Sequence, residues 1–200
     1  MTDPAATLST GAAPGEAPVP LIRPAYAVIA AAALIIMTAA IVIGNRWFLT
    51  YVHVMAGLLW TGIDLFMGFI VGPALRRTSL QVRRSVMLNL LPRTVLLMPT
   101  LSIVTGTSGW FLAVQLGYLD LGYPEFWWVI AALVIITILS IQGLGYLLPT
   151  NIKLFYIYQR PDADPAEIGR VMGSYIRVIA VQGTMQVAII VVMTKFGSGL

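Results

Sequence analysis

The chain has 200 residues, of which 58% are hydrophobic and only 10% are charged, with a formal net charge of +4. Soluble domains carry roughly a quarter charged residues, so this composition excludes a water-soluble globular protein. The chain has no cysteine, which excludes disulfides, iron–sulfur clusters, thiolate metal sites and thiol catalysis. Its basic residues lie in short loops beside apolar segments, where they orient a protein in a membrane, and we therefore predict no nucleic-acid partner.

The first segment, residues 1–20, is rich in Ala, Pro, Gly, Ser and Thr and carries no apolar periodicity. This composition predicts a disordered cytoplasmic tail. The segment lacks the basic start of a secretory signal peptide, so we expect the first apolar helix to be retained as an anchor. Residues 21–200 are predicted to form a single transmembrane helical domain.

Five apolar segments follow the tail. A hydrocarbon core of about 30 Å requires about 20 apolar residues per helix, and the chain has room for five such spans. The sequence therefore predicts an all-α, polytopic membrane helix bundle with membrane lipid as its surroundings. The expected helices cover residues 24–44, 47–75, 92–117, 126–148 and 168–195.

The charged loops predict an orientation. Four arginines lie in the segment RRTSLQVRRS, and Lys153 and Arg160 lie in the next loop on the same side, which marks this side as cytoplasmic. The loop LDLGYPE, with two acids and no base, is then external. Aromatic residues at the ends of the second, third and fourth helices would form a belt on that external side. We expect a bacterial inner-membrane protein with its N-terminus in the cytoplasm and its C-terminus outside.

The second helix carries the residues with the most chemical potential, in the string YVHVMAGLLWTGIDLFMGFIVG. Trp60 and Asp64 each fall within roughly 20° of His53 at about 100° per residue, and the three residues therefore share one face. Gly57 lies on the same face, where its missing side chain would leave room between His53 and Trp60. A polar and aromatic face with such a gap suits a partner helix or a bound ring.

Asp64 is expected near the middle of the membrane, where an aspartate costs about 2.5–3.5 kcal/mol by insertion scales. A residue at that cost is a candidate for function, here a proton relay. The structural alternative is a protonated Asp64, or one paired with an arginine to hold helices together. Arg93 and Arg177 are the possible ion-pair partners, because both lie in the cytoplasmic half.

His53 is the only histidine, and it lies near the external boundary of the membrane. A neutral imidazole there could bind a metal or haem iron, or it could serve only as an interfacial hydrogen-bonding residue. With one histidine, a single chain cannot provide a bis-histidine haem site. The prolines Pro92 and Pro99 predict a kinked third helix beside Asp64.

Other intramembrane polar and small residues call for partners inside the bundle. Gln142, Gln182 and Gln186 should find such partners on neighbouring helices. The pairs Gly68/Gly72 and Gly169/Gly173 have the spacing of helix-packing motifs, and these glycine-rich faces could also support a homo-oligomer or a contact with another membrane protein.

The string HVMAGLLWTGIDLFMGFIVGPALRR resembles the first core helix of a loose group of small bacterial membrane families. The group comprises the copper-resistance protein D family, the membrane domain of bacterial urate oxidases and the haem-binding protoporphyrinogen oxidases. The resemblance implies a four-helix core after an additional N-terminal helix, with His53 as a candidate ligand of haem b and Trp60 and Gly57 beside it. Those oxidases also use an intramembrane lysine, whereas Lys153 and Lys195 fall at expected helix ends here, so only His53 carries over.

These observations leave three functional hypotheses open. The first is a protein that binds haem b or a metal through His53 and acts in membrane redox chemistry or in haem or metal handling. The second is a transporter or channel-like protein for a small solute, an ion or protons, in which Asp64 lines the path. The third is a structural or assembly subunit whose polar groups only fix helix contacts. Whether the chain is an enzyme stays open.

Overall fold

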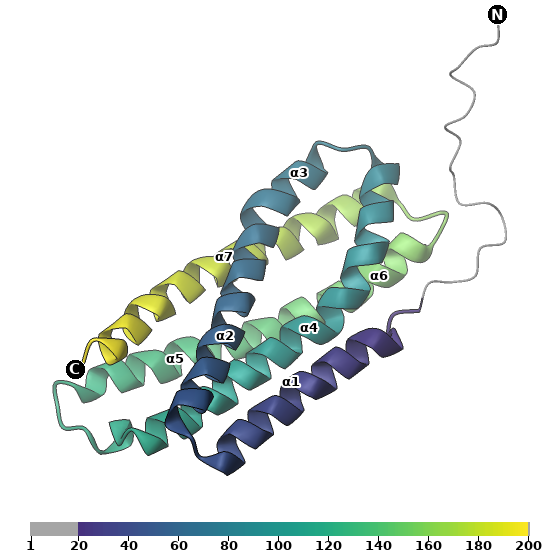
Figure 1. Cartoon of the computed structure of the whole chain (residues 1–200). Helices are drawn as coiled ribbons and strands as arrows, with labels where there is room; N and C mark the ends of the chain where they lie inside the picture. Colours follow the sequence, from purple (N-terminus) through teal and green to yellow (C-terminus); the bar gives the residue numbers. More distant parts are fainter. Residues whose placement is uncertain (1–19, 200) are drawn as a thin grey trace, which may run out of the picture.

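The computed structural model of the chain describes residues 20–199, which form helices joined by short connections, with no strand among them (Figure 1). The predicted tail, residues 1–20, falls outside the described residues except for Pro20. In chain order the helices are α1 (Pro24–Ile43), α2 (Arg46–Leu65), α3 (Gly72–Arg76), α4 (Leu80–Gln115), α5 (Phe126–Gln142), α6 (Leu148–Gln159) and α7 (Pro165–Gly197). Two π-helical turns, η2 (Phe66–Val71) and η4 (Gly143–Leu147), and one 3₁₀ turn, η3 (Tyr118–Asp120), lie between these α-helices.

These elements make five helices that are long and apolar enough to cross a membrane, because α2, η2 and α3 are continuous, as are α5, η4 and α6. The spans are 24–43, 46–76, 80–115, 126–159 and 165–197. The chain is therefore an all-α, multi-pass membrane protein, as its composition predicts.

Four of the five spans are longer than a membrane requires. The first has 20 residues, whereas the others have 31 to 36, or about 46–54 Å at 1.5 Å per residue against a hydrocarbon core of about 30 Å. The contact between α1 and α4 shows at which end α4 is longer than α1. Tyr26, near the start of α1, accepts a hydrogen bond of 2.8 Å from Nε of Arg93 on α4. The part of α4 before Arg93 therefore extends beyond the start of α1.

The extensions of the four long helices pack together into a unit that we call the arginine-end bundle. It consists of η2, α3, residues 80–92 of α4, α6 and the first part of α7. Leu154, Phe155 and Tyr158 of α6 are at most 1% exposed in its centre. Its core also contains Leu75, Met87, Leu91, Leu147, Ile157, Ile168, Met172, Tyr175, Ile176 and Ile179.

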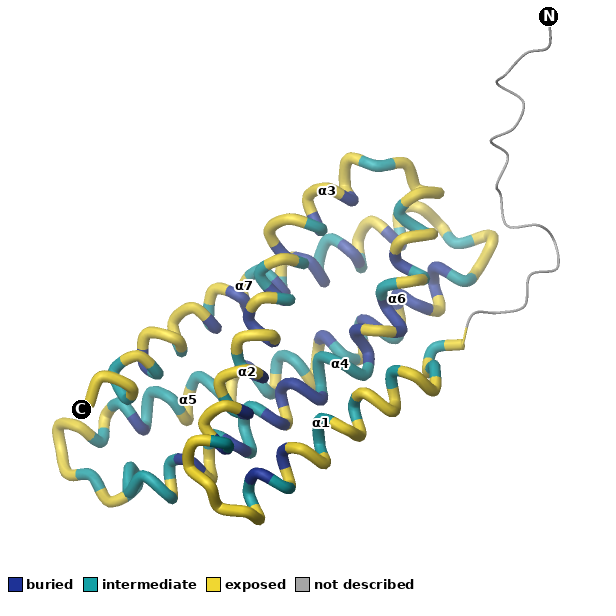
Figure 2. Tube along the Cα trace, in the orientation of Figure 1, coloured by how far each residue is buried: buried dark blue, intermediate teal, exposed yellow. Residues whose placement is uncertain are grey.

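The rest of the molecule, which we call the apolar band, has a different character. Its core is formed by Met37, Ala40, Leu49, Val52, Ala56, Trp60, Leu101, Val104, Leu112 and Leu139. Its outer faces are apolar and exposed, as at Val42 (79%) and Ile141 (68%), which is the surface that lipid covers. Figure 2 shows the largely exposed α1 and the mostly half-buried α5, in contrast with the buried runs of α4 and α6.

Aromatic residues gather where the apolar band ends, opposite the arginine-end bundle. Trp47 stacks on Tyr51 with ring centroids 5.8 Å apart, and Tyr118 lies 4.8 Å from Phe196. Tyr123 makes edge contacts with the rings of Phe126 and Trp127. We call this side the aromatic end.

The predicted length of the arginine-rich loop is wrong. Only residues 77–79 separate α3 from α4, so Pro92 lies inside α4 instead of starting it. The helix begins early because Ser79 caps it, accepting a hydrogen bond from N of Val82 at 3.4 Å. Arg83 is tied to the end of the preceding helix, donating to the carbonyl oxygens of residues 75, 76 and 78 at 3.0–3.3 Å.

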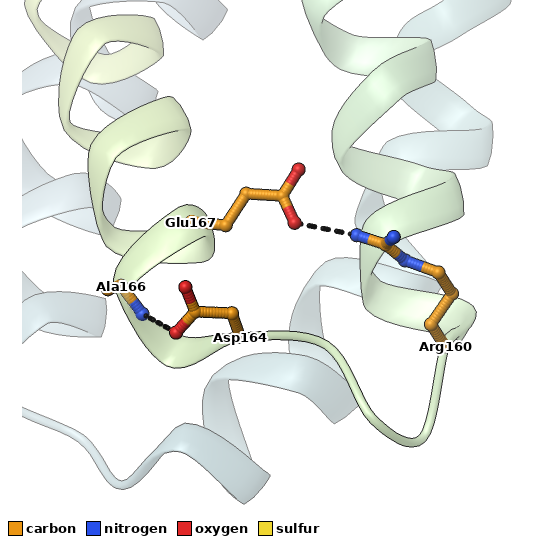
Figure 3. Close-up of polar contacts among 4 residues, drawn as sticks. All are labelled: Arg160, Asp164, Ala166 and Glu167. Carbon is orange, nitrogen blue, oxygen red and sulfur yellow. Dashed lines mark hydrogen bonds and ion pairs between the residues drawn. The ribbon is translucent and has the colours of Figure 1, made fainter.

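The connection between α6 and α7 is also shorter than expected, because α6 continues to Gln159 and includes Lys153. Figure 3 shows how it is held: Asp164 caps α7 by accepting from N of Ala166 at 2.8 Å, and Arg160 pairs with Glu167 at 2.7 Å. The fifth predicted helix accordingly starts at Pro165, three residues earlier than expected, because a proline at the first turn follows a capping aspartate.

The two glycine pairs differ. Gly68 lies against the backbone of α7, where an added Cβ would be 3.2 Å from Cα of Ala180, and a Cβ at Gly72 would be 2.8 Å from Cγ2 of Ile176. This pair is a packing motif, as its spacing predicts. An added Cβ at Gly169 or Gly173 would have no atom within 4 Å among the described residues, so within residues 20–199 this pair does not pack closely against another helix.

Candidate functional site

Asp64 is the centre of a polar cluster in the apolar band. Its side chain is 3% exposed, and its Oδ2 accepts hydrogen bonds from Nε2 of Gln182 at 2.8 Å and from Nε2 of Gln186 at 2.9 Å. The two glutamines lie four residues apart on α7 and therefore share a face, so both amides reach one carboxyl oxygen. Trp60, one turn before Asp64 on α2, also interacts with the carboxyl through its indole.

The expected arginine partners do not reach this carboxyl. Nε of Arg93 donates instead to Tyr26, and its guanidinium lies 5.8 Å from the centre of that ring. Nε of Arg177 donates to the carbonyl oxygen of Gly173 at 3.2 Å, and its side chain is exposed. Within residues 20–199, Asp64 is therefore solvated by neutral amides and forms no ion pair.

A cavity of about 40 Å³ adjoins Asp64. It is lined by Trp60, Asp64, Thr94, Met98, Pro99, Ser102, Gly143, Leu144, Leu147, Leu148, Asn151, Tyr175, Ile179 and Gln182. One buried water needs about 10–15 Å³ of such space, so the cavity has room for a few water molecules or a small cation. A drug-sized or porphyrin-sized ligand needs several hundred Å³ and does not fit.

The residues that line the cavity extend from Asp64 toward the arginine-end bundle. At one end Gln182 faces Gly143, and at the other Nδ2 of Asn151 donates to Oγ1 of Thr94 at 2.8 Å. Eight residues separate Gly143 from Asn151, or about 12 Å of helix rise. Toward the aromatic end the cavity stops at the level of Ser102, beyond which the helices are closed by the core of the apolar band.

Buried acceptor oxygens at Asn151 and on the two glutamines that bind Asp64 lack a donor. Oε1 of Gln182, Oε1 of Gln186 and Oδ1 of Asn151 accept no hydrogen bond from the described part of the chain. An unsatisfied buried acceptor costs about 1–3 kcal/mol, so each of these oxygens favours water or a cation beside it. The cavity next to Asp64 thus has the polarity to be hydrated.

Two π-helical turns flank the site. η2 begins two residues after Asp64, and η4 contributes Gly143, Leu144 and Leu147 to the cavity wall. π-helical turns occur mostly as single insertions in α-helices and frequently lie at functional sites. Pro99 of α4 lines the same cavity, as expected for a proline beside Asp64. Three spans therefore depart from regular α-helical hydrogen bonding around one carboxyl group.

His53 lies elsewhere on α2, against α4. Its Nδ1 lies 3.0 Å from the carbonyl oxygen of Thr105 and 3.3 Å from Oγ of Ser108. Because a carbonyl oxygen only accepts, Nδ1 must carry the proton in the first contact, which leaves the lone pair on Nε2. A Cβ added at Gly109 would be 2.7 Å from Cε1 of His53, so only glycine permits the ring to sit there.

The other residues that we assigned to a bound ring do not frame a space for one. The space beside Gly57 is occupied by Thr105 of α4, since a Cβ added at Gly57 would lie 3.5 Å from Cγ2 of Thr105. Trp60 is 3% exposed and faces the Asp64 cavity, which does not include His53. A porphyrin therefore does not fit between α2 and α4 next to His53. In residues 20–199, no group of three or more histidine, cysteine or acidic side chains is placed to hold a metal ion.

Some residues of the site were not singled out from the sequence. Thr94 and Asn151 line the polar cavity, and Gly109 receives the imidazole. Asn151 could have been found as an amide within an apolar run, but the helix expected over residues 126–148 ended before it. The glutamines were expected to find bundle partners, and they do: Gln142 donates to the carbonyl oxygen of Val178, and the other two bind Asp64.

Comparison of the chain with known proteins gives no match: no family model, no curated protein and no solved structure is found to be similar. The resemblance to the histidine-bearing membrane families stays a prediction.

Proposed function

We propose that this is an inner-membrane protein of bacteria that moves protons or small cations, with Asp64 as the residue that takes up and releases them. The observation that carries the proposal is the Asp64 carboxyl, buried without a counter-charge, bonded to two amides, and open on one side to a polar cavity. Intramembrane carboxyl groups that face a hydrated cavity mark proton and ion pathways.

The hydrogen bonds of Asp64 suit both protonation states. Both glutamine amides donate to the same oxygen, Oδ2, which can accept them as a carboxylate oxygen or as the carbonyl oxygen of the neutral acid. Since both hydrogen bonds from α7 reach Oδ2, a proton can bind to or leave Oδ1 without rearrangement of the two glutamines. A carboxyl group that served only to fix helices would gain nothing from this asymmetry.

The cavity supports exchange with one side of the membrane. Its polar lining reaches from Asp64 to Asn151 and Thr94, which are buried beside the core of the arginine-end bundle, whereas the other direction ends at the apolar core of the apolar band. Positively charged flanks favour the cytoplasm, so we propose that Asp64 exchanges with the cytoplasm along this polar lining when the core of the arginine-end bundle opens, and that the C-terminus lies outside. Release to the other side requires a second conformation, for which the π-helical turns η2 and η4 are the weakest points.

Proton movement across vesicles tests the proposal. The purified protein is reconstituted with a pH-sensitive dye inside, and a potential is applied with a potassium gradient. We expect wild-type protein to acidify or alkalise the lumen and Asp64→Asn to abolish this flux while the protein stays folded, because Asn retains size and polarity but cannot ionise. Thr184→Ala, on the exposed side of α7, is the matched control. Equal flux in the wild type and Asp64→Asn would refute the role of Asp64, and no flux of protons, Na⁺ or K⁺ would favour the structural-subunit hypothesis.

A second candidate function is ligation of a metal or haem b by His53. The supporting observation is the hydrogen bond from Nδ1 to the carbonyl oxygen of Thr105, since a ligating histidine commonly donates its other ring nitrogen to a carbonyl and is oriented by it. Because a porphyrin does not fit between α2 and α4, such a group would have to lie at the outer edge of the imidazole, against lipid or another chain. Haem bound there would supply redox chemistry.

The absorption spectrum of the purified protein separates the two candidates. If His53 binds haem b, protein from haem-replete cells shows a Soret band that His53→Ala removes without loss of folding. A colourless wild type that still moves protons would refute haem ligation and leave the proposal for Asp64 intact.

A further inference from the structure

A groove of about 240 Å³ lies on the outer surface of the bundle between α5 and α7. It is lined by Gln142 of α5 and by Ser174, Arg177, Val178 and Val181 of α7. The four residues of α7 follow the spacing of one helix face, so they form a continuous strip. The strip begins beside the arginine-end bundle and continues into the apolar band.

Arg177 is the only charged residue of this strip, and its charge has no counterpart within the described chain. It is exposed and its Nε bonds to the carbonyl oxygen of Gly173, one turn earlier on its own helix, whereas the ion pair among residues 20–199 joins Arg160 to Glu167. Gln182, at the level of Asp64, follows Arg177 by only about one and a half turns, which places the guanidinium at the edge of the apolar band. A guanidinium in that position favours an anion.

A second donor lies next to Arg177. The hydroxyl groups of Tyr146 and Ser174 are 2.6 Å apart, so one of them donates to the other. Two hydroxyl groups have two protons, and this contact uses only one. The remaining hydroxyl proton can be donated to a ligand beside the guanidinium, an arrangement that matches the adjacent oxygens of a phosphate group.

The rest of the groove is apolar. Val178 and Val181 of α7 supply its apolar wall, and Val181 is 54% exposed. A soluble anion would leave this surface unused, whereas the acyl chain of a lipid would cover it. We propose that the groove binds an anionic phospholipid, with its phosphodiester at Arg177 and at the Tyr146–Ser174 hydroxyl pair, and with an acyl chain along Val178 and Val181.

Native mass spectrometry of the full chain in detergent, titrated with phosphatidylglycerol, tests this site. We expect Arg177→Gln to weaken phosphatidylglycerol binding about tenfold, the effect of losing a charge-assisted hydrogen bond, and Ser174→Ala to weaken it by a smaller factor. Arg76→Gln is the matched control, because it removes the same charge from an exposed residue of the arginine-end bundle outside the groove. It should change binding by less than about twofold.

Three results would overturn the proposal. Equal losses in Arg177→Gln and Arg76→Gln would mean that lipid responds only to overall charge. Phosphatidylcholine binding as strongly as phosphatidylglycerol would show that the groove does not distinguish an anionic lipid. Displacement by inorganic phosphate at millimolar concentration would assign the site to a free anion. If Arg177→Gln does not fold, Arg177→Lys decides: it retains the charge but loses the planar donor pair, and it should reduce phosphatidylglycerol binding relative to wild type.

Discussion

The arginine-end bundle and the apolar band are built from the same helices but are stabilised differently. In the arginine-end bundle, large side chains such as Phe155 and Tyr158 are almost fully buried, and charged residues cover the outside. In the apolar band, large aliphatic side chains also face outward, and contacts between helices combine buried Leu, Val and Trp side chains with glycine contacts and the hydrogen bonds of Asp64. Lipid is as apolar as leucine, so the hydrophobic effect drives packing only where helices emerge into water.

This difference also locates function. A buried polar group is tolerable in the arginine-end bundle because water lies near, but in the apolar band it must be satisfied by its neighbours. The Asp64 cluster lies where the two regions meet, with its glutamines in the apolar band and its cavity leading to the arginine-end bundle. The junction places the carboxyl group next to a polar cavity while the surrounding helices keep it buried.

The largest expected difference between the two regions is in the response to truncation of a large side chain. Phe155→Ala removes a side chain that is 1% exposed in the arginine-end bundle and should cost about 3–5 kcal/mol of unfolding free energy. Ile141→Ala, on the lipid-facing surface of α5, should cost less than about 1 kcal/mol. Denaturant unfolding in detergent micelles measures both. Equal costs would mean that the two regions are not packed differently.

In the apolar band, loss of a hydrogen bond to Asp64 should lower the unfolding free energy more than truncation of a lipid-facing side chain does. Gln186→Leu removes one amide donor from Asp64 and should destabilise the protein by about 1.5–3 kcal/mol if the carboxyl is ionised, or about 1 kcal/mol if it is neutral. Unfolding in detergent provides the value, and the double variant Asp64→Leu/Gln186→Leu isolates the coupling between the two side chains. A coupling energy indistinguishable from zero would show that this hydrogen bond is not formed in solution.

The close contact between Gly109 and His53 gives a further test of packing within the apolar band. Gly109→Ala places a methyl group where the His53 ring lies, so the imidazole must leave Thr105, at a cost of about 1–3 kcal/mol. Gly106→Ala on the same helix is the control, because no described atom lies within 4 Å of its added Cβ, and it should be neutral or stabilising by up to about 1 kcal/mol. Thermal unfolding measures the pair. In a His53→Ala background the cost of Gly109→Ala should disappear, and its persistence would contradict the assigned contact.

The sequence predicts much of this fold and less of the site, for reasons visible in particular residues. Hydropathy locates five spans because a helix that faces lipid must be apolar over about 20 residues, as α1 is. Hydropathy fails where a helix leaves the membrane and continues in water: residues 80–91 and 151–159 are mixed in polarity, and we assigned them to loops. The cap at Ser79 was the available signal for the true start of α4.

The site residues on one helix could be grouped from the sequence, but their partners could not. Helical periodicity places Trp60 and Asp64 on a common face, and both line the cavity. Which polar group meets Asp64 depends on how α2 crosses α7, and Gln182 is 118 residues away in the chain. We chose arginines on the basis of charge, whereas the structure uses amides. The roles of His53 and Asp64 remain predictions.

The smallest expected effect concerns the ion pair between Arg160 and Glu167, which closes the connection from α6 to α7. Its side chains are 51% and 31% exposed, so water screens the attraction between the two charges, and such pairs contribute about 0.2–1 kcal/mol. Glu167→Gln should therefore lower the unfolding free energy by no more than that, and the difference from wild type should vanish in high salt.

Asp164→Ala, three residues earlier, removes the N-cap of α7 and should cost about 0.5–2 kcal/mol with little dependence on salt. Unfolding of both variants at low and high salt tests whether this connection, like the rest of the arginine-end bundle, lies in water. A cost for Glu167→Gln well above 1 kcal/mol that persists in salt would instead place the ion pair in a low-dielectric environment, and it would move the boundary of the apolar band toward the start of α7.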